Sequence, residues 1–105
     1  MKRHEQEALL KLKEHLSKVV NLVDYRVFGS KARGEESPGA DIDVMIEVEE
    51  YTPEIEALID DLVFDINLSY NCLISVVIFG KKELEEGPLR ASPIYRSIIE
   101  EGISI

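Results

Sequence analysis

Hydrophobic residues near the start of the chain recur with the period of a helix. Leu9, Leu12, Leu16, Val19 and Val23 are separated by steps of three and four, and lysines and glutamates fill many positions between them. This spacing puts the apolar side chains on one stripe of a helix. The pattern predicts an amphipathic helix over residues 3–21 that covers one face of a sheet.

Two later helices are predicted where a hydroxyl residue precedes a proline. Thr52 and Ser92 can each accept a hydrogen bond from the first helical turn, and the proline that follows each of them suits the first helical position. The first of these helices is expected to run to about residue 68. The second is expected to end at Gly102, after which residues 103–105 can add a short edge strand.

Three segments have the patterns of strands. Residues 24–28 and 40–48 alternate polar and apolar side chains, so each is expected to bury one face. Residues 73–79 are almost continuously apolar, with Ser75 as the polar exception, which is the pattern of a central strand buried on both faces. The order of elements predicts an α/β (α+β) fold, in which helices flank a small mixed sheet.

Length and composition limit the class of protein. A chain of 105 residues suits a single domain over 1–105. No apolar run approaches the roughly 20 residues that a membrane span needs, and the N-terminus lacks the pattern of a secretory signal. Cys72 is the single cysteine and cannot form an intramolecular disulfide, which agrees with a reducing compartment. We therefore expect a cytoplasmic protein.

The net charge is strongly negative, with 21 acidic residues against 12 lysines and arginines. Because affinity for a nucleic-acid backbone comes from basic side chains, this balance argues against a nucleic-acid partner. Two interpretations of the charge remain open. It keeps a small protein soluble, or it faces a basic protein partner.

A glycine–serine pair and two carboxylates carry the candidate chemistry. Gly29 and Ser30 end an apolar run, where glycine permits a sharp turn that can present backbone N–H groups to a phosphate. Asp41 and Asp43 lie two apart on a predicted strand and so share a face. Two adjacent carboxylates suit Mg²⁺ that carries substrate phosphates, so the sequence predicts a nucleotide site.

These motifs resemble a known family. The run from Gly29 to Gly34, followed by Asp41-Ile42-Asp43-Val44, is similar to the signature of the minimal nucleotidyltransferases, small relatives of DNA polymerase β. The resemblance implies the polymerase β-like nucleotidyltransferase fold and assigns roles to the site. Gly29 and Ser30 would hold the triphosphate of a nucleotide, Lys31 and Arg33 would neutralise phosphate charge, and Asp41 and Asp43 would be the catalytic ligands of Mg²⁺. For Arg33, a salt bridge with Glu35 or Glu36 is an equal alternative.

One position departs from the family pattern. Members with full transferase activity are expected to carry a third carboxylate on the next core strand, and the matching residue here is Ser75. A serine hydroxyl is a poor Mg²⁺ ligand and no general base near neutral pH. Asp65 is a minor candidate for a substitute. Glu47 is expected at the rim of the site, and the acidic run that contains Glu47 and Glu49 is expected at a solvated strand end.

The resemblance leaves two functions open. The first is Mg²⁺-dependent transfer of a nucleoside monophosphate, AMP from ATP, to a hydroxyl acceptor. The family implies a tyrosine of a helical HEPN-type toxin as that acceptor and an antitoxin role for this chain. The alternative is a weak or inactive module that binds nucleotide and partner without transfer, which the serine at position 75 favours. A homo-oligomer is compatible with both.

Overall fold

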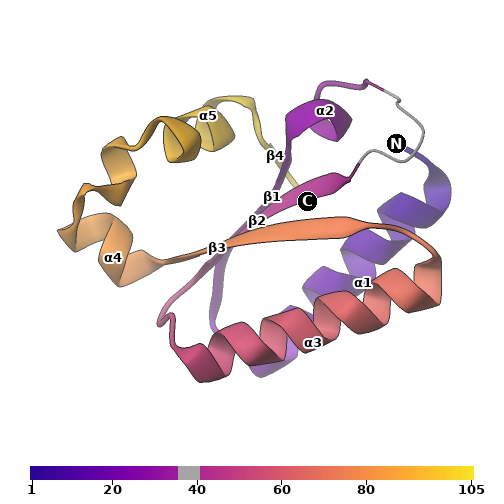
Figure 1. Cartoon of the computed structure of the whole chain (residues 1–105), viewed down its shortest axis with the longest axis horizontal. Helices are drawn as coiled ribbons and strands as arrows, with labels where there is room; N and C mark the ends of the chain where they lie inside the picture. Colours follow the sequence, from indigo (N-terminus) through magenta and orange to yellow (C-terminus); the bar gives the residue numbers. More distant parts are fainter. Residues whose placement is uncertain (36–40) are drawn as a thin grey trace.

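The computed structural model describes residues 1–35 and 41–105, which form four strands with helices on both sides (Figure 1). The N-terminal helix α1 is followed by strand β1 and a single short helical turn, α2. Beyond the undescribed residues, helix α3 joins strands β2 and β3, and three helical segments precede the last short strand. The elements are α1 Arg3–Val19, β1 Leu22–Phe28, α2 Gly29–Ala32, β2 Ile42–Val48, α3 Pro53–Tyr70, β3 Ile74–Gly80, α4 Lys81–Glu86, the 3₁₀ helix η1 Pro88–Ala91, α5 Pro93–Glu101 and β4 Ile103–Ser104.

The four strands form one mixed sheet in the order β3-β2-β1-β4. β1 is antiparallel to both of its neighbours, whereas β2 and β3 are parallel and are joined through α3. This sheet confirms the predicted fold class. The prediction that residues 73–79 form a central strand is wrong, because β3 is the outermost strand of the sheet. The apolar pattern of residues 73–79 indicates that side chains pack on both faces of the strand. It does not indicate whether the strand has a hydrogen-bonded neighbour on each side.

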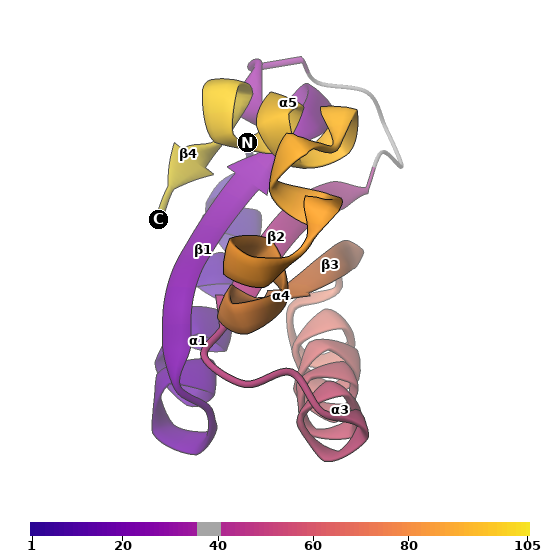
Figure 2. The same cartoon turned by 90° about the vertical axis from the view of Figure 1, so that its left-hand side faces the viewer.

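One face of the sheet holds the larger core. Helices α1 and α3 lie against each other on this face (Figure 2), and the apolar side of β2 lies beneath them. The predicted stripe of α1 is buried at Leu9, Leu12 and Leu16. The phenol of Tyr25 on β1 donates to the carbonyl oxygen of Leu9, so a polar group within this core is paired.

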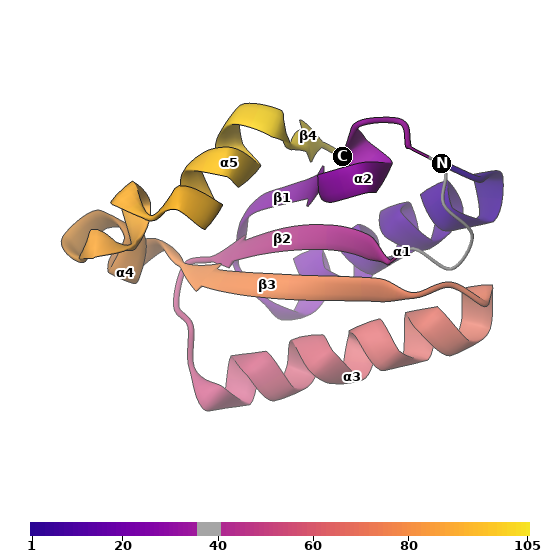
Figure 3. The same cartoon turned by 45° about the horizontal axis from the view of Figure 1, so that its top comes forward.

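The opposite face has a smaller and incomplete cover. Helices α4 and α5 lie above the sheet and α3 below it in Figure 3. Met45, Phe79, Leu84 and Ile98 form the buried cluster on the α4–α5 side, and the rings of Phe79 and Tyr95 meet edge to face. The polar end of β2, which carries Asp43, belongs to this face.

Several predicted boundaries shift by a few residues. α1 ends at Val19, so Val23 lies on β1, where it is exposed. The caps of the two later helices are confirmed, because Thr52 and Ser92 accept hydrogen bonds from backbone N–H groups three residues ahead. α3 continues to Tyr70 and ends at Asn71 in the left-handed conformation.

The short helix after β1 begins at Gly29. Serine is a residue type that favours the N-cap, so the sequence predicts Ser30 in that position, but α2 begins one residue earlier and Phe28 occupies the cap position. The positive φ of Gly29 turns the chain directly into the helix. Residues 35–39 have the composition of a loop, and most of them lie outside the residues that the structure describes. Among the described residues, no helix is long and apolar enough to cross a membrane.

Candidate functional site

The turn after β1 touches the carboxylate of β2. Gly29 has φ +72°, and a Cβ atom built on it would lie 2.5 Å from Asp43 Oδ2. No side chain fits at this position, so glycine is required both for the backbone conformation and for the close approach. The Gly-Ser turn and the acidic strand are therefore in contact, and their joint role as a nucleotide site stays a prediction.

The two aspartates lie where β2 begins. Asp41 directly precedes the strand and is exposed, and Asp43 lies within it. Burial raises the pKa of Asp43 above its ordinary value, and the neighbouring charge of Asp41 raises it further, while Arg33 acts in the opposite direction. A carboxylate whose charge is disfavoured by burial and by a second carboxylate is a good place for a cation.

Ser75 lies beside Asp43 on the adjacent strand. The two residues are paired in the parallel register of β2 and β3, and Phe28 pairs with Asp43 on the other side. Ser75 is exposed, so its side chain is on the open surface next to the aspartate. Ser75 is thus the neighbour of Asp43 on β3, and the assignment of position 75 to a third carboxylate stays a prediction. In the described part of the chain, no group of three or more His, Cys, Asp or Glu residues could hold a metal ion.

Lys31 is engaged within the protein. Its ammonium lies 3.3 Å from Glu5 Oε2, and the lysine side chain is only 4% exposed. Burial raises the pKa of Glu5, but hydrogen bonds from the Lys2 backbone N–H and from Lys31 outweigh this effect, so the pKa is lowered overall. Lys31 therefore ties α2 to α1. Direct contact with phosphate would require an exposed ammonium, and that of Lys31 is buried against Glu5.

Arg33 makes the predicted salt bridge at the surface. Its guanidinium lies 3.2 Å from Glu35 Oε1 and 3.6 Å from Glu101 Oε2 on α5, and these contacts raise the pKa of Arg33. Glu36, the other expected partner, lies outside the described residues. Exposed ion pairs of this kind are weak and exchange easily. The arginine is therefore available to a stronger anion, and its phosphate role stays a prediction.

Two other acidic residues are now placed. Asp65 lies on α3, which covers the face of the sheet opposite to Asp43, so it does not replace the third carboxylate. Glu47 was expected at a solvated rim, and that expectation is wrong. Glu47 is only 8% exposed. Burial raises its pKa above the ordinary value, and the charge of Asp24 raises it further. The cluster of α4 and α5 around Phe79 covers this end of β2, which the alternating pattern alone could not reveal.

Glu5 and Glu101 were missed by the sequence reasoning. Glu5 on α1 pairs with Lys31, which follows it by 26 residues. Glu101 on α5 pairs with Arg33, which precedes it by 68 residues. Lys2 and Glu5 do have the spacing of a reciprocal helix cap, and the Lys2 N–H donates to Glu5 Oε1 at 2.9 Å. That local signal says nothing of Lys31, so only the fold reveals the pairing.

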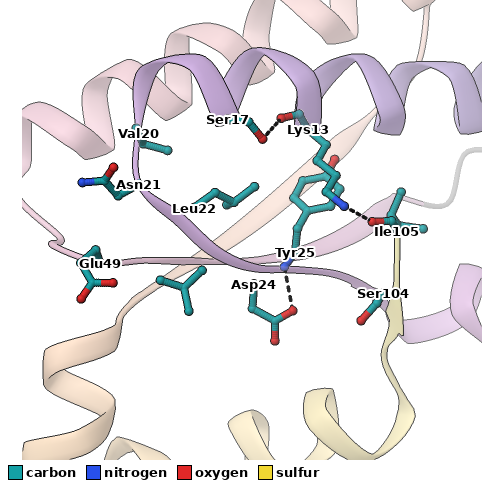
Figure 4. Close-up of a pocket in the computed structure, with 11 residues that line it drawn as sticks. Lys13, Ser17, Val20, Asn21, Leu22, Asp24, Tyr25, Glu49, Ser104 and Ile105 are labelled. Atoms are coloured by element: carbon teal, nitrogen blue, oxygen red, sulfur yellow. Dashed lines mark hydrogen bonds between the residues drawn. The ribbon is translucent and has the colours of Figure 1, made fainter.

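A separate cavity of about 560 Å³ lies between α1 and β1 (Figure 4). Lys13, Tyr25 and the C-terminal Ile105 line it, and Lys13 donates to the carbonyl oxygen of Ile105. None of the predicted site residues is among its lining residues. This cavity is thus distinct from the Gly-Ser and aspartate site.

The mixed sheet with its flanking helices has the polymerase β-like nucleotidyltransferase fold. The family model of the nucleotidyltransferase domain matches residues 7–105, and the chain belongs to this family. A comparison with curated protein sequences gave no significant match.

Solved structures show the same fold. A structure assigned as a minimal nucleotidyltransferase is 25% identical, with a TM-score of 0.62 over 98% of this chain and 91% of the other. A toxin–antitoxin structure, MntA-HpeT, is 16% identical, with a TM-score of 0.63 over 95% of this chain and 70% of the other. A toxin–antitoxin structure with AMP-PNP is also 16% identical, with a TM-score of 0.64 over 93% and 69%.

The site residues fit a divalent cation of the kind this family uses. Mg²⁺ is commonly held by one or two carboxylates, with water and substrate phosphates as its other ligands. Asp41 and Asp43 provide that pair, and the pKa of Asp43 is raised first by burial and then by the charge of Asp41, so a cation beside it would favour its charged form. Ser75 offers only a neutral oxygen beside them.

Proposed function

We propose that this protein is a Mg²⁺-dependent nucleotidyltransferase that moves AMP from ATP to a hydroxyl group of a protein partner. The observation that carries the proposal is the contact between the Gly29 turn and Asp43. In this proposal the Gly29 turn is the phosphate cradle, and it lies directly against carboxylates suited to Mg²⁺. Membership of the nucleotidyltransferase domain family supports the reaction class.

The residues of the turn would bind the triphosphate. Glycine at position 29 lets the backbone approach the phosphates closely, and Ser30 can add its hydroxyl. Arg33 would leave Glu35 and Glu101 for the more highly charged phosphate, since its forked guanidinium suits that geometry. Lys31 would act indirectly, by fixing α2 to α1 through Glu5.

Asp41 and Asp43 would hold Mg²⁺ together with the phosphates. When bound, the ion neutralises phosphate charge and favours departure of pyrophosphate. In the transfer, the acceptor hydroxyl oxygen forms a bond to the α-phosphorus, the α–β phosphoanhydride bond breaks, and the hydroxyl proton passes to solvent. Ser75 cannot take that proton as a carboxylate would. We therefore expect a slow enzyme.

A helical HEPN-type toxin is the partner we propose, with this chain as its antitoxin and a toxin tyrosine as the acceptor. Similarity of fold to the MntA-HpeT toxin–antitoxin structure supports this choice, and the structure with AMP-PNP supports an adenine nucleotide. The acidic charge of the chain supports a protein acceptor over a nucleic acid.

A labelled-nucleotide assay tests the proposal. The protein is incubated with Mg²⁺ and α-labelled ATP, alone and with the product of the neighbouring gene, and label on protein is measured. We expect label on the partner only with Mg²⁺, and none with the Asp41→Asn, Asp43→Asn double variant. No transfer with any nucleotide, together with stable partner binding, would contradict the enzyme.

Partner binding without nucleotide transfer is the result that the alternative function predicts. Ser75 in place of the third carboxylate favours a module that binds nucleotide and masks its partner without transfer. Binding of ATP, measured by calorimetry, would then persist and depend on Asp41 and Asp43. Partner inhibition without nucleotide would distinguish this role from catalysis.

A further inference from the structure

The outward side of α3 carries large apolar side chains in water. Phe64 is 64% exposed and Leu68 is 69% exposed, and they lie one helical turn apart. Leu58, on the flank of the same helix, is 44% exposed. Single exposed apolar residues are ordinary, but this pair forms a ridge on the side of a long helix that faces away from the core.

The same side of α3 is entirely acidic in its charge. Asp60, Asp61 and Asp65 are three or four positions from Phe64 or Leu68 and so flank the ridge. No Lys, Arg or His occurs anywhere in residues 34–80 of the sequence. Within the described residues, none of these three aspartates forms an ion pair. We call this surface, made of Leu58, Asp60, Asp61, Phe64, Asp65 and Leu68, the α3 face.

Helix α1 shows what an ordinary solvated face of this protein looks like. Its exposed side mixes both signs of charge, and Arg3 with Glu7 and Glu14 with Lys18 form ion pairs four residues apart. Such pairs satisfy each other on the helix surface. The aspartates of the α3 face have no such ion pairs among the described residues, so basic side chains of another molecule can pair with them.

We infer that the α3 face is a docking surface for a protein partner that presents a basic helical face with an apolar stripe. The ridge of Phe64 and Leu68 would pack into the groove between side-chain ridges of the partner helix. Lysines or arginines of the partner would pair with the flanking aspartates. This inference rests on the proposed function only in that it gives the partner a place to bind, on a helix that carries none of the nucleotide-site residues.

The charge pattern excludes other occupants. A second copy docked through the same face would bring aspartates against aspartates, and each copy carries a net charge of −9. An anionic membrane surface and a nucleic acid would be repelled in the same way. A basic protein surface is the occupant that both the ridge and its acidic border favour.

The α3 face also borders the outer edge of the sheet. Asn67 of α3 brackets Ile74 at the start of β3, since its amide donates to the Ile74 carbonyl and its Oδ1 accepts from the Ile74 N–H. β3 is the outermost strand and carries Ser75. A partner on α3 would thus lie next to the strand that carries one wall of the nucleotide site.

Titration with a synthetic peptide tests the docking surface without any nucleotide. The probe is a helical peptide with leucines at i, i+4 and i+7 and lysines beside them, and its control is a peptide of the same composition in an order that forms no stripe. Binding to the full chain is followed by fluorescence anisotropy, and the contact is mapped by NMR shifts of backbone amides. We expect the striped peptide alone to bind, with shifts centred on Phe64 and Leu68, and affinity to fall with added salt.

Matched variants complete the test. Phe64→Ser with Leu68→Ser, and separately Asp61→Lys with Asp65→Lys, should each weaken binding about tenfold or more, as for central interface residues. Leu10→Ser with Glu14→Lys makes the same kinds of change on α1, where Leu10 is 58% exposed, and should leave binding within about twofold. Circular dichroism checks that all three remain folded.

Equal binding of both peptides, or an equal effect of the α1 variant, would overturn the inference. So would a dimer in sedimentation that is lost in the Phe64→Ser, Leu68→Ser variant, because a second copy would then cover the face. The labelled-ATP assay reports nucleotide transfer separately. Failure of the wild-type chain to bind the striped peptide, with intact transfer, would contradict the docking surface alone, and peptide binding without transfer would contradict the proposed enzyme alone.

Discussion

Gly29 and Asp43 are in such close contact that a single added methyl group would collide with the carboxylate. The built Cβ of Gly29 lies 2.5 Å from Asp43 Oδ2 and 3.4 Å from its Cγ. The turn and the carboxylate are separated by a segment that includes the undescribed residues, yet they meet because β1 and β2 are adjacent antiparallel strands. Their contact is what makes the sequence motif a site.

Gly29→Ala should therefore disrupt the site as well as the backbone. A non-glycine residue in the left-handed conformation costs about 1–2 kcal/mol, which lowers the Tm of a domain of this size by about 4–8 °C per kcal/mol. The added Cβ also has to displace the Asp43 carboxylate, so we expect ATP binding, measured by calorimetry, to fall at least about tenfold.

Gly34→Ala is the matched control for that change. Gly34 has φ +76°, close to that of Gly29, but nothing lies within 4 Å of its built Cβ. It should lower the Tm to a similar degree and leave ATP binding unchanged. Equal loss of ATP binding in both variants would show that backbone strain, rather than contact with Asp43, is responsible.

The ionisation of Asp43 should destabilise the fold near neutral pH. Burial and the charge of Asp41 raise its folded-state pKa above the ordinary 3.8. The folded protein then binds more protons than the unfolded chain between these two pKa values, so stability is lost as the pH rises through the folded pKa. Asp43→Asn removes this loss. Its Tm, followed by circular dichroism without Mg²⁺, should exceed that of the wild type at pH 7, and the gain should shrink toward pH 3.5. A gain that grows as the pH falls would contradict the raised pKa.

Ser75→Asp should supply the missing carboxylate. Position 75 is exposed and paired with Asp43, so a carboxylate there can reach the same cation without being buried. We expect faster Mg²⁺-dependent transfer of label from ATP, by an order of magnitude or more for an added general base. Ser75→Asn, of similar size and without charge, should give no gain. If neither variant changes the rate while both bind ATP, the third position lies elsewhere.

The buried pair of Lys31 and Glu5 should contribute strongly to stability. Removal of one partner from a buried ion pair typically costs about 3–5 kcal/mol, because the other charge is left uncompensated. Lys31→Met should accordingly lower the free energy of unfolding in urea, and the double variant with Glu5→Gln should recover part of the loss. Arg33→Met removes an exposed pair and should cost no more than about 1 kcal/mol. Similar effects at Lys31 and Arg33 would contradict the difference in burial.

The pattern of side chains predicted the elements because local periodicity and caps are physical constraints on the chain itself. Thr52 and Ser92 cap their helices as expected, since a cap involves only residues within one turn. The alternation in β2 gave the correct face to Asp43 for the same reason, because the pleat of a strand fixes which side chains share a face.

Long-range features were beyond such patterns. The position of β3 at the sheet edge depends on which strands become neighbours, and the apolar run of 73–79 is equally compatible with a centre and an edge. Burial of Glu47 and of Lys31 likewise depends on helices that arrive from distant segments. No local signal records these contacts.

The sequence by itself determined the Gly-Ser pair, the two aspartates two positions apart, the serine at position 75 and the excess of negative charge, because each is a property of residue type and short spacing. Only the tertiary structure decided that Gly29 touches Asp43, that Ser75 stands beside that aspartate, that Lys31 faces Glu5, and that Phe64 and Leu68 remain in water. These are contacts between segments, and they form only when the strands and helices pack together.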